Sequence, residues 1–207
     1  MTNEPTIFIV DDDEAVRDSL KALLESAGLK VQAYGSGQEF LNANDPSRSG
    51  CLLLDIRMPD MNGLEVQEEL VAKQDNLPII IITGHGDIPI AIKAMKAGAF
   101  DFIEKPFKDE VILDSLRRAL GLDEQFRRKE SSAIDVGARV AFLTPREREV
   151  LEQLVIGRQN KVIAFDLGIS PRTVEVHRAR VMEKMKARSL SHLVRMALAA
   201  GINPQPS

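Results

Sequence analysis

Three absences limit what this chain of 207 residues can be. It has one cysteine, Cys51, so an internal disulfide is excluded, and the apolar run around Cys51 predicts a small core residue rather than a reactive thiol. No apolar run approaches the roughly 18 residues that a membrane-spanning helix needs. The opening MTNEPTIFIVDDDE has no basic segment and soon becomes acidic, which predicts that it is not a signal peptide. We therefore expect a soluble, cytoplasmic protein.

The composition is that of an ordinary soluble protein, with 44% apolar and 28% charged residues, and the length allows one large domain or two small ones. The charge is unevenly spread. Residues 1–139 carry a net charge of −9, whereas residues 140–207 carry +5. This contrast predicts two domains with different partners, and the basic part is the natural place for nucleic acid to bind.

In the first part, short apolar runs alternate with helical patterns. The predicted strands are residues 6–10, 30–34, 51–54, 78–82 and 100–103, and the predicted helices are 16–27, 36–42, 64–73, 88–97 and 109 to about 129. Five such repeats demand a mainly parallel, doubly wound sheet with helices on both faces. Gly121 weakens the last helix by about 1 kcal/mol relative to alanine but need not break it. Residues 131–138 follow as a predicted flexible joint.

The second part is predicted to be all helical. Thr144, Pro145 and Glu147 form a capping-box pattern that starts a helix ending at Gly157. Residues 160–167 form a short second helix, and Gly168-Ile169-Ser170 forms a tight turn. A third helix then runs from Pro171 to about Met185, and a fourth spans residues 191–200. Two short helices around a tight turn indicate a helix-turn-helix.

Polar side chains follow the predicted strands at one edge of the sheet. They are Asp11 and Asp12 after the first strand, Asp55 after the third, Thr83 after the fourth and Lys105 after the fifth. In open parallel sheets, ligands bind at this edge. Three carboxylates there repel one another and need a cation, and oxygen ligands suit Mg²⁺, which leaves positions for a phosphoryl oxygen. Asp55 is the candidate nucleophile, while Lys105 and the Thr83 hydroxyl would neutralise phosphoryl charge.

Other interpretations of these carboxylates stay open at this point. An acidic cluster after a strand is often a solvated turn or a helix N-cap. A phosphatase with an aspartyl-phosphate intermediate would use similar residues, but it needs a second acid, and Arg57 stands two residues after Asp55. A third possibility is a DNA-binding protein whose first domain only dimerises. The combination of acid pair, central aspartate, threonine and lysine, each after the appropriate strand, favours phosphoryl transfer.

On the third helix of the second part, Val174, Val181 and Met185 share one stripe and are predicted to pack inward. The residues expected to face DNA are Lys161, Arg172, Thr173, Glu175, Val176, Arg178, Ala179 and Arg180. Their mixture of polar and small apolar side chains suits base edges and thymine methyl groups, while the basic ones suit phosphates. Lys184, Lys186 and Arg188 are also placed to contact phosphates or border the interface. A charged, solvated helix face is the alternative.

Residues 5 to about 125 resemble the receiver domain of two-component response regulators, through IVDDDE, LLLDIRMPDMNG, IIITGHGD and FDFIEKPF. The resemblance implies a flavodoxin-like strand order 2-1-3-4-5 and phosphorylation of Asp55 by a histidine kinase. It also implies that Asp11, Asp12, Asp55 and the backbone carbonyl of Arg57 surround Mg²⁺. Two further implications are that Thr83 and Phe102 act as switch residues and that Lys105-Pro106 is a cis peptide. Arg57 and His85 stand where the family varies the lifetime of the phosphate.

Residues 140–201, with LTPREREVL and ISPRTVEVHRARVMEKM, resemble the LuxR-type helix-turn-helix. A receiver followed by this module is the architecture of the NarL/FixJ family. The resemblance implies a transcription activator, not a substrate-turnover enzyme, that dimerises on phosphorylation and binds promoters. The wording is most similar to nitrogen-fixation regulators, which implies an oxygen-sensing kinase of the FixL type, although regulators of aromatic catabolism share much of it. The implied domains are residues 1–124, a linker at 125–140 that is helical at its start, and 141–207.

Overall fold

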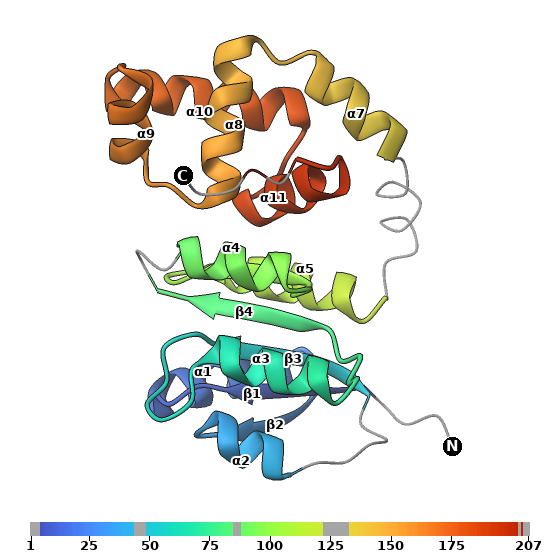
Figure 1. The fold of residues 1–207 in the computed structure, drawn as a ribbon. Helices are drawn as coiled ribbons and strands as arrows, with labels where there is room; N and C mark the ends of the chain where they lie inside the picture. The colour runs from blue at the N-terminus through green and yellow to red at the C-terminus, as the bar shows by residue number, and fades with distance from the viewer. Residues whose placement is uncertain (1–4, 44–48, 85–87, 122–132, 203, 205–207) are drawn as a thin grey trace. The chain divides into compact units, whose positions relative to one another are not determined.

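The structure, a computed structural model, describes residues 5–43, 49–84, 88–121, 133–202 and 204. The chain forms two compact units (Figure 1). One comprises residues 1–87 and 97–126 and contains the sheet, and the other comprises residues 88–96 and 127–207, whose described elements are all helices. No helix among the described residues is long and apolar enough to cross a membrane.

Five parallel strands form the sheet in the order β2-β1-β3-β4-β5, which confirms the predicted order. The strands are β1 (Thr6–Val10), β2 (Lys30–Tyr34), β3 (Gly50–Asp55), β4 (Ile79–Thr83) and β5 (Asp101–Glu104). The apolar runs of β1, β3 and β4 are buried, as expected for central strands covered on both faces. The register pairs Val10 with Leu54, so Asp11 and Asp55 end neighbouring strands at the same edge.

Helices connect the strands, and all but the last lie within a few residues of their predicted bounds. They are α1 (Glu14–Ser26), α2 (Gly37–Asn42), α3 (Gly63–Ala72), α4 (Ile88–Lys96) and α5 (Asp109–Ala119). Leu24 of α1 and Ile112 of α5 pack in one buried cluster with alternate strand residues such as Ile9. On the opposite side of β1, the ring of Phe8 packs against that of Phe40 in α2, at a centroid distance of 5.8 Å. Helices therefore cover both faces of the sheet, as the repeats predict.

The prediction that the last helix of this unit continues through Gly121 is wrong. Helix α5 ends at Ala119, and Gly121 has a φ of 69°, which is left-handed and ends a right-handed helix. The backbone N–H of Gly121 donates to the carbonyl of Arg118, as in a helix-ending turn. The rest of the predicted extension, to residue 129, lies outside the described residues.

The helical unit contains the predicted helix-turn-helix. Its helices in the second part of the chain are α7 (Ala133–Ala141), α8 (Pro145–Ile156), α9 (Asn160–Leu167), α10 (Pro171–Met185) and α11 (Leu190–Ala199) (Figure 1). The predicted capping box at Thr144 and Glu147 is present, and Gly157 ends α8 in a left-handed conformation. Ser170 caps α10 by accepting a hydrogen bond from the backbone N–H of Thr173. Local capping chemistry therefore sets the helix boundaries here.

The predicted flexible joint at residues 131–138 is wrong over the residues that the structure describes. Residues 133–141 form helix α7, where four helices had been predicted for the whole second part. Val136 and Val140, spaced i and i+4, pack in the buried core of the helical unit with residues such as Leu151 and Met185. The end of the linker is therefore part of this unit. Residues 131 and 132 lie outside the described residues.

Candidate functional site

The first candidate site lies where β1, β3 and β5 end. The ammonium Nζ of Lys105 lies 2.8 Å from Oδ2 of Asp11 and 2.8 Å from Oδ1 of Asp55. Lys105 lies 94 positions from Asp11 and 50 from Asp55 in the sequence, so the fold of the sheet brings the three residues together. The structure thus unites the predicted aspartates and lysine in one ionic cluster. The peptide bond between Lys105 and Pro106 is cis, as the resemblance implied.

Burial decides the electrostatics of this cluster. Asp11 is 2% exposed and Asp55 is 6% exposed. Burial raises the pKa of Asp55, the charge of Asp11 also raises it, and the hydrogen bond and charge of Lys105 only partly offset these effects. Burial lowers the pKa of Lys105, but its hydrogen bonds to both carboxylates and their charges outweigh this and raise it. The ammonium of Lys105 is stabilised by two carboxylates, whereas each carboxylate shares the single positive charge of Lys105 with the other.

The carboxylates also hold backbone groups. Oδ2 of Asp55 accepts a hydrogen bond from the N–H of Arg57 at 2.6 Å, and Oδ1 of Asp11 accepts one from the N–H of Asp13 at 2.9 Å. A carboxylate oxygen can accept two hydrogen bonds, so acceptor capacity remains at these oxygens. The pair carries one more negative charge than Lys105 neutralises. The donor set therefore fits a hard cation such as Mg²⁺.

The remaining acids of the first cluster differ from one another. Asp12 is exposed, and Asp13 is the N-cap of α1, where its Oδ1 accepts from the N–H groups of Ala15 and Val16. The capping interpretation is thus correct for Asp13 but not for Asp11. Among the residues that the structure describes, no group of three or more Asp, Glu, His or Cys side chains is arranged to hold a metal ion. Two of the three predicted carboxylate ligands, Asp11 and Asp55, come together through Lys105.

The proposed switch residues are both buried. Thr83 is fully buried at the end of β4, and the hydrogen bond of its Oγ1 within the described part of the chain is a long one, 3.4 Å to the carbonyl of Gly84. Phe102 lies on the neighbouring strand β5, where it pairs with Ile81. Arg57 is exposed beside Asp55. His85 lies outside the described residues.

The sequence did not indicate two groups of the sheet-containing unit, one at this edge and one at the opposite end of β5. Arg17 of α1 donates from Nη1 to the backbone carbonyl of Asp11 at 2.7 Å, which fixes the turn that carries this aspartate. In addition, the buried carboxylate of Asp101 accepts from Ser115 and from Arg118, both at 2.7 Å. A charged residue within a buried strand was the available signal for this second group, but its partners on α5 could not be identified without the fold.

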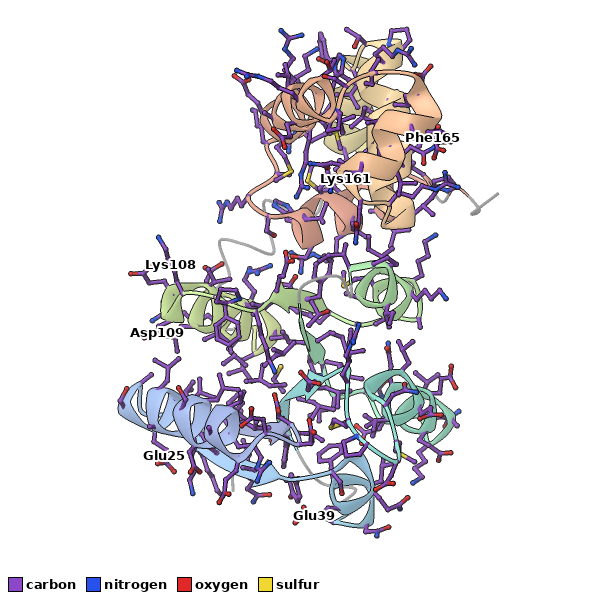
Figure 2. The ribbon with its side chains drawn as sticks, turned by 90° about the vertical axis from the view of Figure 1, so that its left-hand side faces the viewer. Glu25, Glu39, Lys108, Asp109, Lys161 and Phe165 are labelled. Carbon is purple, nitrogen blue, oxygen red and sulfur yellow. The ribbon has the colours of Figure 1, made fainter. Side chains whose placement is uncertain are left out.

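The second candidate site is the helix-turn-helix of α9 and α10. Val174, Val181 and Met185 are fully buried, which confirms the predicted inner stripe. Six predicted contact residues on α10 are exposed and one, Arg178, is half-buried: the exposed ones are Arg172, Thr173, Glu175, Val176, Ala179 and Arg180. Lys161 on α9 is exposed as well (Figure 2). The hydroxyl of Thr173 hydrogen-bonds to that of Ser170, so it contributes to the cap of α10.

Lys184 has a role that the sequence reasoning did not identify. Its Nζ lies 2.6 Å from Oε2 of Glu147, a carboxylate that is only 2% exposed, and 3.3 Å from the carbonyl oxygen of Phe142. The hydrogen bond from Lys184 lowers the pKa of Glu147 most strongly, and the N–H and hydroxyl of Thr144 lower it further against the opposing effect of burial. Lys184 therefore ties α10 to the capping box of α8.

Comparison with known proteins identifies both domains. Residues 7–117 match the response regulator receiver domain family, and residues 141–197 match the bacterial regulatory proteins of the luxR family. The chain is 54% identical to the transcriptional regulatory protein FixJ of Azorhizobium caulinodans, over 96% of this chain and 94% of that protein. It is 46% identical to the response regulator protein TodT of Pseudomonas putida strain F1, over 92% and 84% of the two chains.

Among solved structures, full-length FixJ from B. japonicum is similar, with 48% identity and a TM-score of 0.55 over 98% of this chain and 100% of that one. The response regulator StyR is similar as well, with 43% identity and a TM-score of 0.55 over 95% and 99% of the two chains. These matches confirm the predicted pairing of a receiver with a LuxR-type helix-turn-helix and the predicted likeness to FixJ.

Proposed function

Since this chain belongs to the response regulators that join a receiver domain to a LuxR-type DNA-binding domain, we propose that phosphorylation of Asp55 by a sensor histidine kinase controls its binding to promoter DNA. The observation that carries the proposal is the buried cluster of Asp11, Asp55 and Lys105 at the strand ends. It presents a nucleophilic carboxylate beside a cation, and it has a second carboxylate suited to a metal. The chain acts as a regulator and turns over no substrate.

The phosphoryl step follows from this arrangement. A carboxylate oxygen of Asp55 attacks the phosphorus of a phosphohistidine that is protonated on its other ring nitrogen, the P–N bond breaks with its electron pair going to the nitrogen, and neutral imidazole leaves. Lys105, already 2.8 Å from Asp55, offers its ammonium to the phosphoryl oxygens. Asp11, Asp12, Asp55 and the carbonyl of Arg57 are the proposed Mg²⁺ ligands. When bound, the ion supplies positive charge against the phosphoryl group.

The proposed switch uses Thr83 and Phe102. The hydrogen bond of the Thr83 hydroxyl to the carbonyl of Gly84 is long and therefore weak, so breaking it to move the hydroxyl toward a phosphoryl oxygen on Asp55 costs little. The vacated space then lets the Phe102 ring turn inward and reshapes the surface around β5, which becomes a face for dimerisation. The phosphoryl group shifts this equilibrium only as far as it interacts better with the inward form.

In the proposed dimer, two helix-turn-helix modules engage paired half-sites on duplex DNA. The exposed side of α10 lies in the major groove, where Glu175, Val176 and Ala179 meet base edges. Arg172, Arg178 and Arg180 contact the backbone or bases, and Lys161 reaches a phosphate from α9. The net charge of +5 over residues 140–207 supports this assignment.

The proposed targets are nitrogen-fixation genes, with a FixL-like kinase as phosphodonor. The likeness to FixJ at 54% identity supports this choice. The alternative is control of another pathway, such as aromatic catabolism, and the 46% identity to TodT supports this alternative. The proposed domains are residues 1–124 and 141–207 with a linker between them, and α7 extends the second domain upstream, because Val136 and Val140 belong to its core.

Labelling with acetyl phosphate, followed by intact-protein mass measurement, tests phosphorylation. With Mg²⁺ present, we expect the wild-type chain to gain one phosphoryl group and Asp55→Asn to gain none. Asp60→Asn is the matched control, because Asp60 is an exposed aspartate in the following loop and its φ of 68° is tolerated by asparagine. The assignment of Asp55 as the phosphorylated residue would be overturned if Asp55→Asn were labelled as fully as the wild type. It would also be overturned if the wild type gained no phosphoryl group in the presence of Mg²⁺.

A further inference from the structure

The C-terminal end of α10 is held from outside the helix-turn-helix. A helix leaves its last four carbonyl groups without partners inside the helix. In α10, the N–H groups of Lys186 and Ala187 donate to the carbonyls of Glu183 and Met182, in a turn where Lys186 has a left-handed φ of 54°. The carbonyl of Met185 instead accepts a hydrogen bond from Nη1 of Arg139, at 3.1 Å.

Burial makes this bond consequential. Met185 is fully buried, so water cannot replace a lost partner of its carbonyl oxygen. The guanidinium also places a positive charge at the negative end of the helix dipole. Arg139 therefore satisfies a group of α10 that solvent does not reach, and it does so from a different helix.

Arg139 itself is fixed in place by α7. Val136, three residues before it, and Val140, the next residue, pack in the same core as Met185. Helix α7 contacts both α10 and α11. The arginine thus reaches α10 from a helix that is anchored in the core, immediately before the segment 141–197 that matches the luxR family.

The proposed DNA-reading residues lie toward the other end of α10. The helix has 15 residues, which corresponds to a length of about 22 Å. A rotation of roughly 5° about its C-terminal end would move the opposite end by about 2 Å, which exceeds the tolerance of a hydrogen bond. Holding the carbonyl of Met185 therefore controls where Arg172 and Glu175 lie relative to DNA.

We propose that Arg139 is a positioning residue for DNA recognition, which seats α10 through the carbonyl of Met185, so that the DNA-reading unit begins within α7. This inference rests on the proposed sequence-specific DNA binding. It assigns to the end of the linker a part in recognition that requires no contact between Arg139 and DNA. A displacement of α7 would then change base reading without changing any residue on the exposed side of α10.

The test compares full-length Arg139→Gln with the wild type, both phosphorylated with acetyl phosphate. The probes are a duplex that the wild type selects from a random-sequence library and a scrambled duplex of the same composition. We expect Arg139→Gln to lower the ratio of specific to scrambled affinity by about tenfold. We expect its affinity for the scrambled duplex, and the slope of log K against log salt, to stay unchanged, because no phosphate contact is lost.

Two further variants complete the design. Arg139→Lys keeps a cationic donor and is expected to recover most of the specificity ratio, which also tests the proposal if Arg139→Gln does not fold. Arg148→Gln is the control, since Arg148 makes an exposed i,i+4 pair with Glu152. The proposal is overturned if a folded Arg139→Gln keeps the wild-type ratio of specific to scrambled affinity, or if Arg139→Lys recovers none of that ratio. It is also overturned if the salt slope of Arg139→Gln falls by about one, because that would indicate a lost phosphate contact. A wild type that selects no sequence overturns both this inference and the proposed function.

Discussion

At the scale of single residues, Lys105 determines whether Asp11 and Asp55 can lie side by side as anions. Each aspartate was predictable, because each directly follows a buried apolar strand. The pairing was not, because the Nζ of Lys105 reaches both aspartates only across the folded sheet. The same limit applies to the ion pair of Asp101 and Arg118. The sequence also could not distinguish a helix N-cap such as Asp13 from a metal ligand, because that distinction depends on where α1 begins.

Replacing Lys105 by methionine leaves two buried carboxylates without their shared cation. We expect Lys105→Met to lower the free energy of unfolding by about 2–3 kcal/mol at pH 7. Burial and Asp11 already raise the pKa of Asp55, and losing Lys105 raises it further. The cost of the substitution is therefore largest where both acids are ionised and shrinks as pH falls and they protonate.

Urea unfolding of Lys105→Met and the wild type at pH 7 and pH 4.5 checks this expectation. Lys108→Met serves as control, because Lys108 is an exposed lysine that makes no side-chain hydrogen bond as the N-cap of α5 (Figure 2). A stability difference that is the same at both pH values would show that the carboxylates are not the cause.

At the scale of elements, helix ends with local signals were predictable and those set by tertiary packing were not. Helices α8, α9 and α10 have the predicted bounds: Thr144 and Gly157 cap the two ends of α8, Gly168 ends α9 in a left-handed conformation, and Ser170 caps the start of α10. Helix α7 was missed because Gly137 suggested a flexible joint. Val136 and Val140 are only two apolar residues at helical spacing, and they are recognisable as core residues only once the fold shows what they pack against. Helix α5 was made too long for the opposite reason, because an apolar pattern continues past its end.

The end of α5 gives a prediction in which the sign of the stability change shows whether the helix stops before Gly121. If Gly121 lay inside a helix, Gly121→Ala would stabilise the protein by about 1 kcal/mol. With the observed φ of 69°, alanine is strained, and we expect a loss of about 1 kcal/mol instead. Chemical denaturation of the full chain measures the difference. A gain in stability would mean that the helix continues through residue 121.

The link between α8 and α10 gives a second prediction at this scale. Lys184→Met leaves the buried carboxylate of Glu147 without its cation, so we expect the melting temperature of the helical unit to fall at pH 7. Because the native pKa of Glu147 is lowered, its stabilising contribution is present above the unfolded pKa and is lost as pH falls through the native one. The difference from wild type should therefore shrink at low pH.

Calorimetry at neutral and acid pH measures this difference. Lys161→Met is the matched control, because Lys161 is exposed on α9. An equal loss of stability in both variants, or a difference from wild type that grows as pH falls, would argue against the ion pair as the source.

At the scale of the whole molecule, an acidic unit with the proposed phosphoryl-accepting edge and a basic unit with a helix-turn-helix belong to one chain. The charge contrast between residues 1–139 and 140–207 predicted this division before any fold was known. The central claim is that the chemistry at Asp55 controls DNA binding by α10. Its consequence is that phosphate should raise both dimer population and specific affinity together, since two half-sites require two modules.

The most direct measurement follows mass and DNA binding of the full chain in the same samples, with and without acetyl phosphate and Mg²⁺. Sedimentation gives the oligomeric state, and fluorescence anisotropy on a selected duplex gives the affinity. We expect the phosphodonor to convert the wild type to a dimer with higher specific affinity and to leave Asp55→Asn unchanged. Equal dimerisation and DNA affinity of Asp55→Asn and wild type in the presence of phosphodonor would contradict the account.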